Sequence, residues 1–347
     1  MLLAEGAAAD AASITTSFDV TGAVLHPVTE TLASLEALQP QSASVSYLSG
    51  SKSVSATFTG PTLWTVLNQA GLASVPGAKN SILRNVVVAT GSDGYKVAFS
   101  GGELDPRFAG ARTPDLVAYA ENGQPLDADG FARTVVPGDQ RGARYVSNLS
   151  NLNVVQAPSN QGAGGGRSSS FTLSGLVQHS TTYDAKSLSS LPAVTEAVTY
   201  TSAGNPVSAS FTGVSLWDLL TRAGLVIDPL IKNDELRQYV LATGSDGYEA
   251  TFSLGELDPR FGGSSAVPDL VAYAENGSSL GDDGFARLVV PGDAAGGRYV
   301  SNLVSLQIFD ATMSTVPLPS SAPMFGAAVL ALGAVGYGLK RKSAAAA

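Results

Sequence analysis

Apolar and polar side chains alternate along several short segments of the chain. The pattern occurs in residues 18–24, 45–47, 54–58 and 95–99; Val45, for example, lies between two serines, and the second of them separates it from Tyr47. A period of two turns every second side chain toward the same face of a strand. We therefore predict strands that each bury one face.

One segment follows a helical pattern instead. Apolar residues in 63–70 recur at intervals of three and four, Thr62 precedes them as an N-cap, and Gly71 is placed to end the helix. A shorter helix is predicted over residues 32–38. Together these segments predict an α+β domain with more strand than helix.

The pattern occurs twice in the chain. Residues 18–155 recur as 171–308, at an offset of 153 residues up to Phe108 and 154 after it. The extra residue lies in a Gly-, Ala- and Pro-rich stretch, where a loop can absorb it. We therefore predict two tandem copies of one domain. The repeated motifs include TGSDGY (90–95 and 243–248), GELDPRF (102–108 and 255–261), DLVAYAENG (115–123 and 269–277) and RYVSNL (144–149 and 298–303).

The repeat divides the chain into five segments. They are a head (1–16), the first copy (17–156), a linker (157–170), the second copy (171–310) and a tail (311–347). The linker reads APSNQGAGGGRSSS, a composition that buries little apolar surface and behaves as flexible coil. We expect two tethered domains, with a docked pair as the alternative.

Charge and residue usage argue against several classes of function. The net charge is −9 and no basic run precedes the last few residues, so nucleic acid is not an expected partner, because neutralising phosphates takes clustered cations. The 347 residues include no cysteine and only His26 and His179. Disulfides, thiolate catalysis and a zinc or copper site are therefore not expected.

The tail has the organisation of a membrane-anchored sorting signal. The motif VPLP at 316–319 precedes an apolar stretch at 322–339 and a basic end at 340–342. A transmembrane helix over the apolar stretch would be ~27 Å long, close to the thickness of a hydrocarbon core, with its cations on the cytoplasmic side. The order of these elements resembles the PEP-CTERM sorting signals of Gram-negative bacteria, and a plain C-terminal anchor is the alternative.

That resemblance implies a route through the inner membrane. It implies export, cleavage near the motif by an exosortase-type enzyme, and a final place at the cell surface or outside the cell. It also implies a link to extracellular polysaccharide, and a protein partner is the alternative. Residues 1–16 lack a basic n-region and have only an interrupted apolar run, so we interpret them as a signal-peptide remnant or a disordered head.

Most of the repeated motifs contain turn chemistry. Asp93-Gly94, Asn122-Gly123 and Asp129-Gly130, like their equivalents in the second copy, are dipeptides that favour hairpin turns. Residues 127–130 resemble the start of a calcium loop, but Gly138 stands where that loop needs its bidentate glutamate. We expect structural roles for these motifs.

The repeated carboxylates and histidines point to no catalytic pair. Nothing in the sequence brings two of the carboxylates together for acid–base chemistry, so surface and turn roles are expected for them. His26 and His179 hold matching positions just after the first strand of each copy, where a loop role is expected and a ligand role is the alternative. The carboxylates are Glu103, Asp105 and Glu121, with Glu256, Asp258 and Glu275 in the second copy.

Four arginines are notable because cations are scarce in this chain. Arg133 and Arg144 in the first copy match Arg287 and Arg298 in the second. A guanidinium group suits bidentate binding of phosphate or carboxylate, which predicts an anion site. Ion pairs with nearby aspartates such as Asp139 explain the arginines equally well. No catalytic residue and no metal ligand is predicted.

A longer series of motifs connects both copies to a known family. It includes LWTVL (63–67), AYAENG (118–123), VVPG (135–138) and GARYV (142–146), with the matching series at 211–300. Together they resemble the molybdopterin-binding domain of the sulfite oxidase family over nearly the whole of each repeat. The resemblance implies a mixed α+β fold built on strongly bent sheets. It also implies a cysteine thiolate on molybdenum and basic residues on the pterin phosphate.

The chain departs from that family at the metal site. The loop equivalent to the family's cysteine lies near 48–50 in the first copy and 201–203 in the second, and neither contains a cysteine. A serine hydroxyl is a poor substitute because its pKa is far above that of a thiol. Arg144 and Arg298 match the family's arginine and are the candidate cofactor-binding residues, whereas Ser147 and Ser301 replace its lysine and Asn148 and Asn302 its tryptophan.

Two functions fit these observations. The first, which the missing cysteine favours, is a non-enzymatic surface or matrix protein whose two cofactor-free modules bind a polymer, a small ligand or a protein. The second is a molybdopterin-dependent oxidoreductase of the sulfite oxidase type that holds its cofactor through Arg144 or Arg298. Bound molybdenum distinguishes the two.

Overall fold

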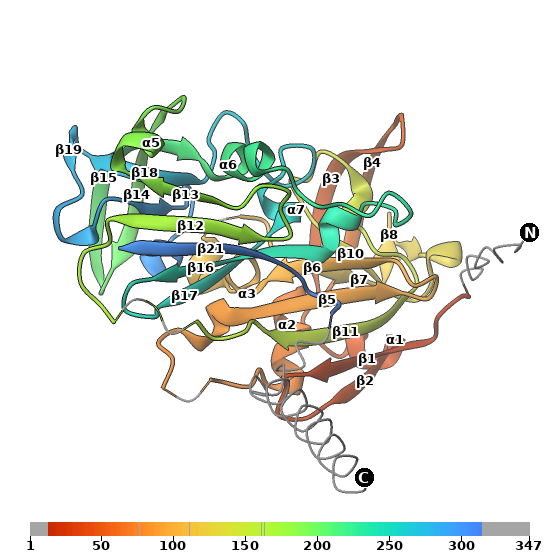
Figure 1. Cartoon of the computed structure of the whole chain (residues 1–347). Helices are drawn as coiled ribbons and strands as arrows, with labels where there is room; N and C mark the ends of the chain where they lie inside the picture. Colours follow the sequence, from red (N-terminus) through yellow and green to blue (C-terminus); the bar gives the residue numbers. More distant parts are fainter. Residues whose placement is uncertain (1–12, 76, 111, 161, 163, 314–347) are drawn as a thin grey trace, which may run out of the picture. The chain divides into compact units, whose positions relative to one another are not determined.

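The structure is a computed structural model that describes residues 13–313 except 76, 111, 161 and 163 (Figure 1). Both repeats belong to one compact unit that ends at Thr312. The apolar stretch predicted to cross the membrane at 322–339 and most of the predicted head lie outside the described residues. Among the residues that are described, no helix is long and apolar enough to cross a membrane.

The first repeat is built mainly of strands, which form three sheets, and the alternating segments of the sequence lie in them. Its main sheet has the order β2-β1-β11-β5-β6, with β1 and β11 parallel and the other neighbours antiparallel. The bounds are β1 (Ser17–Gly22), β2 (Val28–Thr31), β11 (Leu149–Gln156), β5 (Asn85–Gly91) and β6 (Lys96–Ser100). The other strands are β3 (Gln41–Ser49), β4 (Lys52–Gly60), β8 (Ala120–Glu121) and β9 (Gln124–Pro125) in one sheet, with β7 (Leu116–Ala118) paired to β10 (Arg133–Val135).

The helices of the first repeat are short. The predicted helix is confirmed as α2 (Leu63–Ala70): the Thr62 hydroxyl accepts a hydrogen bond from the Thr65 backbone N–H at 3.0 Å, and Gly71 ends the helix with φ 67°. The second predicted helix is α1 (Leu32–Glu36), which stops two residues early. The others are α3 (Gly101–Leu104), α4 (Pro106–Ala109), η1 (Ser81–Arg84), η2 (Asp127–Asp129) and η3 (Gly142–Arg144).

The second repeat has the same strand order in its main sheet. That order is β13-β12-β21-β16-β17, formed by β13 (Thr181–Asp184), β12 (Ser170–Gly175), β21 (Leu303–Asp310), β16 (Gln238–Gly244) and β17 (Glu249–Ser253). The second sheet contains β14 (Val194–Ser202), β15 (Asn205–Ser215), β18 (Leu270–Glu275), β19 (Ser278–Ser279) and β20 (Arg287–Val289). The helices are α5 (Ala185–Ser189), α6 (Leu216–Ala223), α7 (Leu254–Leu257), η4 (Asp234–Arg237), η5 (Gly281–Asp283) and η6 (Gly296–Arg298).

Two of the three predicted turn dipeptides form hairpin turns. Asn122-Gly123 joins β8 to β9 with φ angles of 51° and 75°, as a turn with two left-handed residues requires. In the turn between β5 and β6, the Asp93 carboxylate accepts a hydrogen bond from the Tyr95 N–H at 2.9 Å. Asp129-Gly130 was wrongly predicted to be a hairpin: it ends η2, where Gly130 has φ 88°.

The two repeats are docked, so the expectation of two tethered domains is wrong. Phe108 of the first repeat is packed in the hydrophobic core of the second, and Phe261 of the second is packed in the core of the first. Each ring is about 95% buried, with exposures of 5% and 4%. A further buried cluster joins Val88 to Tyr239 and Leu241 at the junction where β6 lies beside β17 (Figure 1). The exchange of apolar anchors explains why the repeats form one unit.

The Gly- and Ser-rich linker contacts the second repeat. The backbone N–H of Asn160 donates to Glu249 Oε1 at 2.5 Å, and the N–H of Gly165 donates to the Ser245 carbonyl at 2.7 Å. The linker therefore follows the surface of a docked pair in these residues.

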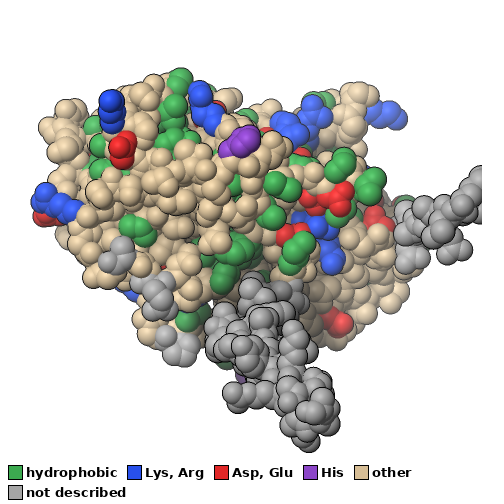
Figure 2. All heavy atoms as spheres, in the orientation of Figure 1, with side chains coloured by type: hydrophobic (Ala, Val, Ile, Leu, Met, Phe, Trp, Pro, Cys, Tyr) green, Lys and Arg blue, Asp and Glu red, His purple; other side chains and the backbone are tan. Residues whose placement is uncertain are grey.

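On the face shown in Figure 2, charged side chains form small separate patches and most of the surface is uncharged.

Candidate functional site

A cleft of about 580 Å³ lies between the two repeats, at the loop that resembles the family's cysteine loop; we call it cleft 1. Leu48, Ser49 and Gly50 line it from the first repeat, in the turn between β3 and β4. Lys232 and Arg260 line it from the second repeat. Cleft 1 therefore exists only because the repeats are docked.

Local backbone pairing positions the loop in cleft 1. The Leu48 N–H donates to the Gln140 carbonyl at 2.9 Å, and Leu48 forms a bridge with Arg141. Gly50 has φ 61°, which the tight turn needs and a glycine adopts without strain. This pairing brings the Arg141 backbone next to the loop at 48–50, although the two segments are far apart in the sequence.

Tyr95 forms part of the wall of cleft 1. Its hydroxyl donates to the Ala143 carbonyl at 2.8 Å and accepts from the Asn233 side-chain amide at 2.9 Å. Burial raises the Tyr95 pKa to about 12, so the hydroxyl stays protonated at neutral pH. This bond from Asn233 joins the two repeats directly at the cleft.

Cleft 1 is net positive. Its charged lining consists of Arg141, Lys232, Arg260 and Asp93. Arg260 is paired with Asp258 at 2.5 Å. Among the described residues, Arg141 and Lys232 form no ion pair, and both are exposed. Two cations are therefore available to an anion in this cleft.

The second repeat has an equivalent cleft with the opposite charge balance. This cleft 2, of about 870 Å³, is lined by two cations, Lys79 and Arg287, and by three carboxylates, Asp246, Glu275 and Asp283. Lys79 matches Lys232, but Ala295 stands where cleft 1 has Arg141. Arg287 is itself paired with Asp283. Cleft 2 is therefore the less suited of the two to an anion.

The donor set of the two clefts does not fit a thiolate-bound molybdenum. Leu48, Ser49 and Gly50 in cleft 1, and Thr201, Ser202 and Ala203 in cleft 2, provide only hydroxyls and apolar groups at the position of the family's cysteine. A soft thiolate ligand is what such a metal centre takes from its protein, and a neutral hydroxyl does not replace it.

The candidate cofactor-binding arginines, Arg144 and Arg298, lie inside the interface between the repeats. Arg144 donates to Asp139 Oδ2 and Oδ1 at 2.8 and 2.7 Å and to Glu103 Oε2 at 2.8 Å. These are bidentate, charge-assisted bonds, and Arg144 is 97% buried, with an exposure of 3%. An external anion would have to displace a carboxylate to reach the guanidinium. The role of Arg144 and Arg298 in binding a cofactor stays a prediction.

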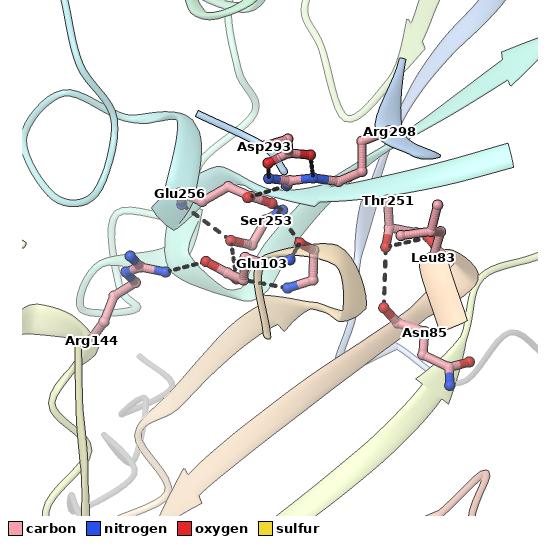
Figure 3. A network of polar contacts seen from close by, with 10 residues as sticks. Leu83, Asn85, Glu103, Arg144, Thr251, Ser253, Glu256, Asp293 and Arg298 are labelled. Atoms are coloured by element: carbon pink, nitrogen blue, oxygen red, sulfur yellow. Dashed lines mark hydrogen bonds and ion pairs between the residues drawn. The ribbon is translucent and has the colours of Figure 1, made fainter. Parts of the chain in front are cut away.

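Arg298 repeats this arrangement in the second repeat. It is fully buried, donates to both oxygens of Asp293 at 2.9 and 2.7 Å, and donates to Glu256 Oε2 at 2.5 Å (Figure 3). Arg144 and Arg298 thus form ion pairs with nearby aspartates, which was the alternative explanation for these arginines. The other two, Arg133 and Arg287, pair with Asp129 and Asp283 four residues earlier.

Each repeat completes the helix cap of the other. Glu103 accepts from the N–H of Ser100 at 2.7 Å, as in a capping box, and also from the Ser253 hydroxyl at 2.9 Å. Glu256 likewise accepts from the N–H of Ser253 at 2.8 Å and the Ser100 hydroxyl at 2.6 Å. Figure 3 shows the two glutamates between the arginines of the two repeats. This network ties Arg144 and Arg298 into one buried set of charges.

The surroundings of Glu103 in this network raise its proton affinity. Burial raises the pKa of Glu103, the negative charge of Glu256 raises it further, and Arg144 opposes both effects.

Glycine is required where the arginine stems cross the interface, because a Cβ on Gly102 would lie 2.4 Å from Cδ of Arg298. The equivalent Cβ on Gly255 would lie 2.5 Å from Cδ of Arg144.

The other predicted candidates are not brought together. Asp105 and Asp258 are buried and cap the turns that follow α3 and α7, where each pairs with an arginine two residues later. Glu121 and Glu275 lie on β8 and β18, away from this network. No group of three metal-ligating side chains is found in the described part of the chain.

The histidines lie in loops, as expected. His26 and His179 are exposed, and their backbone N–H groups donate to the carbonyls of Ala70 and Ala223 at 2.9 and 3.0 Å. These bonds hold the loop after the first strand against the end of the long helix in each repeat. A structural position in the loop accounts for both residues.

Sequence reasoning missed the residues that give cleft 1 its charge. Arg141 and Lys232 come from different repeats, so no local motif contains both. One signal was present: Arg141 is matched by Ala295 in an otherwise closely repeated stretch. This difference gives the lining of cleft 1 a cation that the lining of cleft 2 lacks.

Comparison with known proteins supports the family resemblance for the second repeat. Residues 167–316 match the family model described as "Oxidoreductase molybdopterin binding domain". No curated protein matches the chain. Among solved structures, the sulfane dehydrogenase SoxCD from Paracoccus pantotrophus is similar over 67% of this chain and 77% of that chain, with 14% identity and a TM-score of 0.33. The second repeat is thus similar to an oxidoreductase-type molybdopterin-binding domain.

Proposed function

We propose that this chain is a binding protein built on two copies of an oxidoreductase-type molybdopterin-binding scaffold, and that cleft 1 binds an anionic ligand without redox chemistry. The observation that supports it best is that Arg141 and Lys232, which form no ion pair with any described residue, line one cleft from two repeats. Residues 167–316, which match a cofactor-binding family, contribute Lys232 and Arg260 to the lining of this cleft. A loop of Leu48, Ser49 and Gly50 offers the ligand a hydroxyl and backbone groups rather than a metal ligand.

The test uses pyrophosphate as the probe in isothermal titration calorimetry on the full chain. We expect saturable binding that weakens with salt, because the attraction is between exposed charges. Replacing both Arg141 and Lys232 with alanine should weaken binding by about 10-fold to 100-fold, which is the effect of losing charge-assisted hydrogen bonds. Lys79→Ala, the equivalent change in cleft 2, is the matched control and should leave the affinity unchanged. Equal affinity in the double variant and the unaltered chain would contradict the proposal.

The second candidate function is a molybdopterin-dependent oxidoreductase of the sulfite oxidase type. The family match over residues 167–316 favours it, and the absence of cysteine from the sequence argues against it. The full chain would be produced with export in a host that makes molybdopterin, and its molybdenum would be measured by mass spectrometry. We expect far less than one molybdenum per chain. A stoichiometric amount would instead establish the oxidoreductase, and Arg144→Ala with Arg298→Ala would then test the predicted cofactor site.

We also propose that the chain is exported and held at the cell surface through its tail. The VPLP motif, the apolar stretch at 322–339 and the basic end support an exosortase-type partner, passage through the inner membrane and a polysaccharide or protein partner outside the cell. In a host with that machinery, we expect the chain in the surface fraction with a mass that shows loss of the tail. A variant truncated before residue 316 should escape into the periplasm or medium. Full-length chain confined to the cytoplasm would contradict export.

A further inference from the structure

A third cavity is lined mainly by the first repeat, apart from cleft 1. It has a volume of about 620 Å³, within the usual range for small-molecule sites. Trp64 and Thr65 line it from α2, and Pro106 and Pro137 add apolar walls. We call it the Trp64 pocket. None of its lining residues lines cleft 1.

Two opposite charges in the Trp64 pocket lack partners. Three of its charged residues, Glu103, Asp139 and Arg144, neutralise one another through the bonds at 2.7–2.8 Å described above. The other two are Asp115 and Arg112. Within the described part of the chain, neither side chain forms an ion pair, and neither has a hydrogen bond among the side-chain contacts of the structure. Above the pKa of Asp115, the pocket therefore presents a carboxylate and a guanidinium beside an aromatic wall, neither of them ion-paired to a described residue.

We propose that the Trp64 pocket binds a small zwitterion of the α-amino-acid class. Asp115 pairs with the ammonium group, Arg112 pairs with the carboxylate, and the apolar side chain packs against Trp64 and the prolines. A ligand with a single charge would leave the other protein charge unpaired, and a neutral ligand would leave both. An unpaired charge that a ligand covers costs binding free energy, so the two charges select for a ligand that carries both signs.

The second repeat contains a smaller version of this pocket. Trp217 and Asp269 take the places of Trp64 and Asp115, but the cavity is only about 250 Å³. The position of Arg112 is occupied by Ala266, and Arg112 itself lines both pockets. Because one guanidinium serves both cavities and only one of them is large enough, we expect one ligand per chain.

Asp115 makes the binding dependent on pH. Burial raises its pKa well above the ordinary range, Glu103 and Asp139 raise it further, and Arg144 and Arg112 oppose this rise. A protonated Asp115 loses its attraction for an ammonium group. Affinity for the amino acid should therefore increase as the pH rises through the Asp115 pKa.

The probe is L-phenylalanine, titrated calorimetrically into the full chain. We expect saturable binding with one site, and at least tenfold weaker binding of 3-phenylpropionate, which lacks the ammonium, and of phenethylamine, which lacks the carboxylate. Asp115→Asn should abolish the preference for phenylalanine over phenylpropionate. Arg112→Gln should abolish the preference over phenethylamine. Arg222→Gln, on the exposed side of α6, is the matched control and should bind normally.

A fluorescence measurement identifies the pocket directly. The chain has two tryptophans, so Trp217→Phe leaves Trp64 as the single emitter. L-Leucine, which does not itself fluoresce, should then change the emission with the affinity measured by calorimetry. Absence of saturation by either amino acid overturns the proposal, as does unchanged selectivity in Asp115→Asn and Arg112→Gln. Tighter binding of neutral sugars than of amino acids also overturns it.

Discussion

Replacing Arg298 with alanine is expected to lower the free energy of unfolding by about 3–5 kcal/mol. Arg298 is fully buried and forms its bonds with Asp293 and Glu256, whose side chains are 0% and 4% exposed. The substitution removes the cation and leaves two buried carboxylates without compensation. Denaturant unfolding of the full chain, followed by circular dichroism, measures the loss.

The control for this prediction is an ion pair at the surface. Arg167 is paired with Asp282, but the two side chains are 67% and 96% exposed. Arg167→Ala should change the free energy of unfolding by about 0–1 kcal/mol, because water already solvates both charges. A loss in the Arg298 variant no larger than that in the control would show that the buried network contributes little.

Asp269→Asn is expected to raise the free energy of unfolding by about 2–4 kcal/mol at pH 8 and to change it little at pH 4. The Asp269 pKa is raised to about 7: burial is the largest cause, Glu256 and Asp293 add to it, and Arg298 and Arg112 oppose it. An asparagine has the same shape and carries no charge, so it avoids ionisation in an unfavourable environment.

The sign of this effect follows from proton binding. A carboxyl whose pKa is higher in the folded than in the unfolded state holds its proton more tightly when folded, so its stabilising contribution is complete below the unfolded value, near pH 4. That contribution is lost as the pH rises toward 7, where the folded carboxyl ionises. Unfolding curves from pH 4 to pH 8 test this, with Asp282→Asn at the exposed surface as the control. A constant difference between Asp269→Asn and the unaltered chain at every pH would contradict the explanation.

The ion pairs of Arg144 and Arg298 indicate a role in the stability of the fold more than in binding a ligand. Arg144 and Arg298 retain the positions of arginines that the resemblance assigns to a cofactor, yet each is bound to two carboxylates of its own repeat. The stems of both arginines cross to a glycine of the other repeat, Gly255 or Gly102. We infer that the network specifies how the repeats dock. Separation of the repeats would expose charges that only the docked state buries together with their partners.

Cleft 1 and cleft 2 differ in their charged residues, and this difference makes the proposed anion binding testable. A duplication supplies two equivalent sites, and each can lose or gain charges while the scaffold remains. Arg141 in cleft 1 and Ala295 in cleft 2 are the main such difference. Lys232→Ala in cleft 1 therefore has its own control, Lys79→Ala in cleft 2, within the same molecule and with the same fold around it.

Local elements were predicted well because their causes are local. The Thr62 cap, the apolar spacing of residues 63–70 and Gly71 together specify α2, and each acts within one or two turns of the chain. Alternation specifies β3 and β4 for the same reason. The prediction for Asp129-Gly130 failed because a dipeptide that tolerates positive φ can end a 3₁₀ helix as well as a hairpin.

By itself, the sequence determined the internal repeat of its motifs, the strand and helix pattern of each repeat, the resemblance supported for the second repeat, and the absence of cysteine. Only the tertiary structure decided that the repeats dock through exchanged phenylalanines, that Arg144 and Arg298 are neutralised inside the interface, and that Arg141 and Lys232 meet in one cleft. The physical reason is that periodicity and capping depend on neighbours in the chain. Docking depends on complementary surfaces and charges whose residues lie more than 90 positions apart, as Arg141 and Lys232 do.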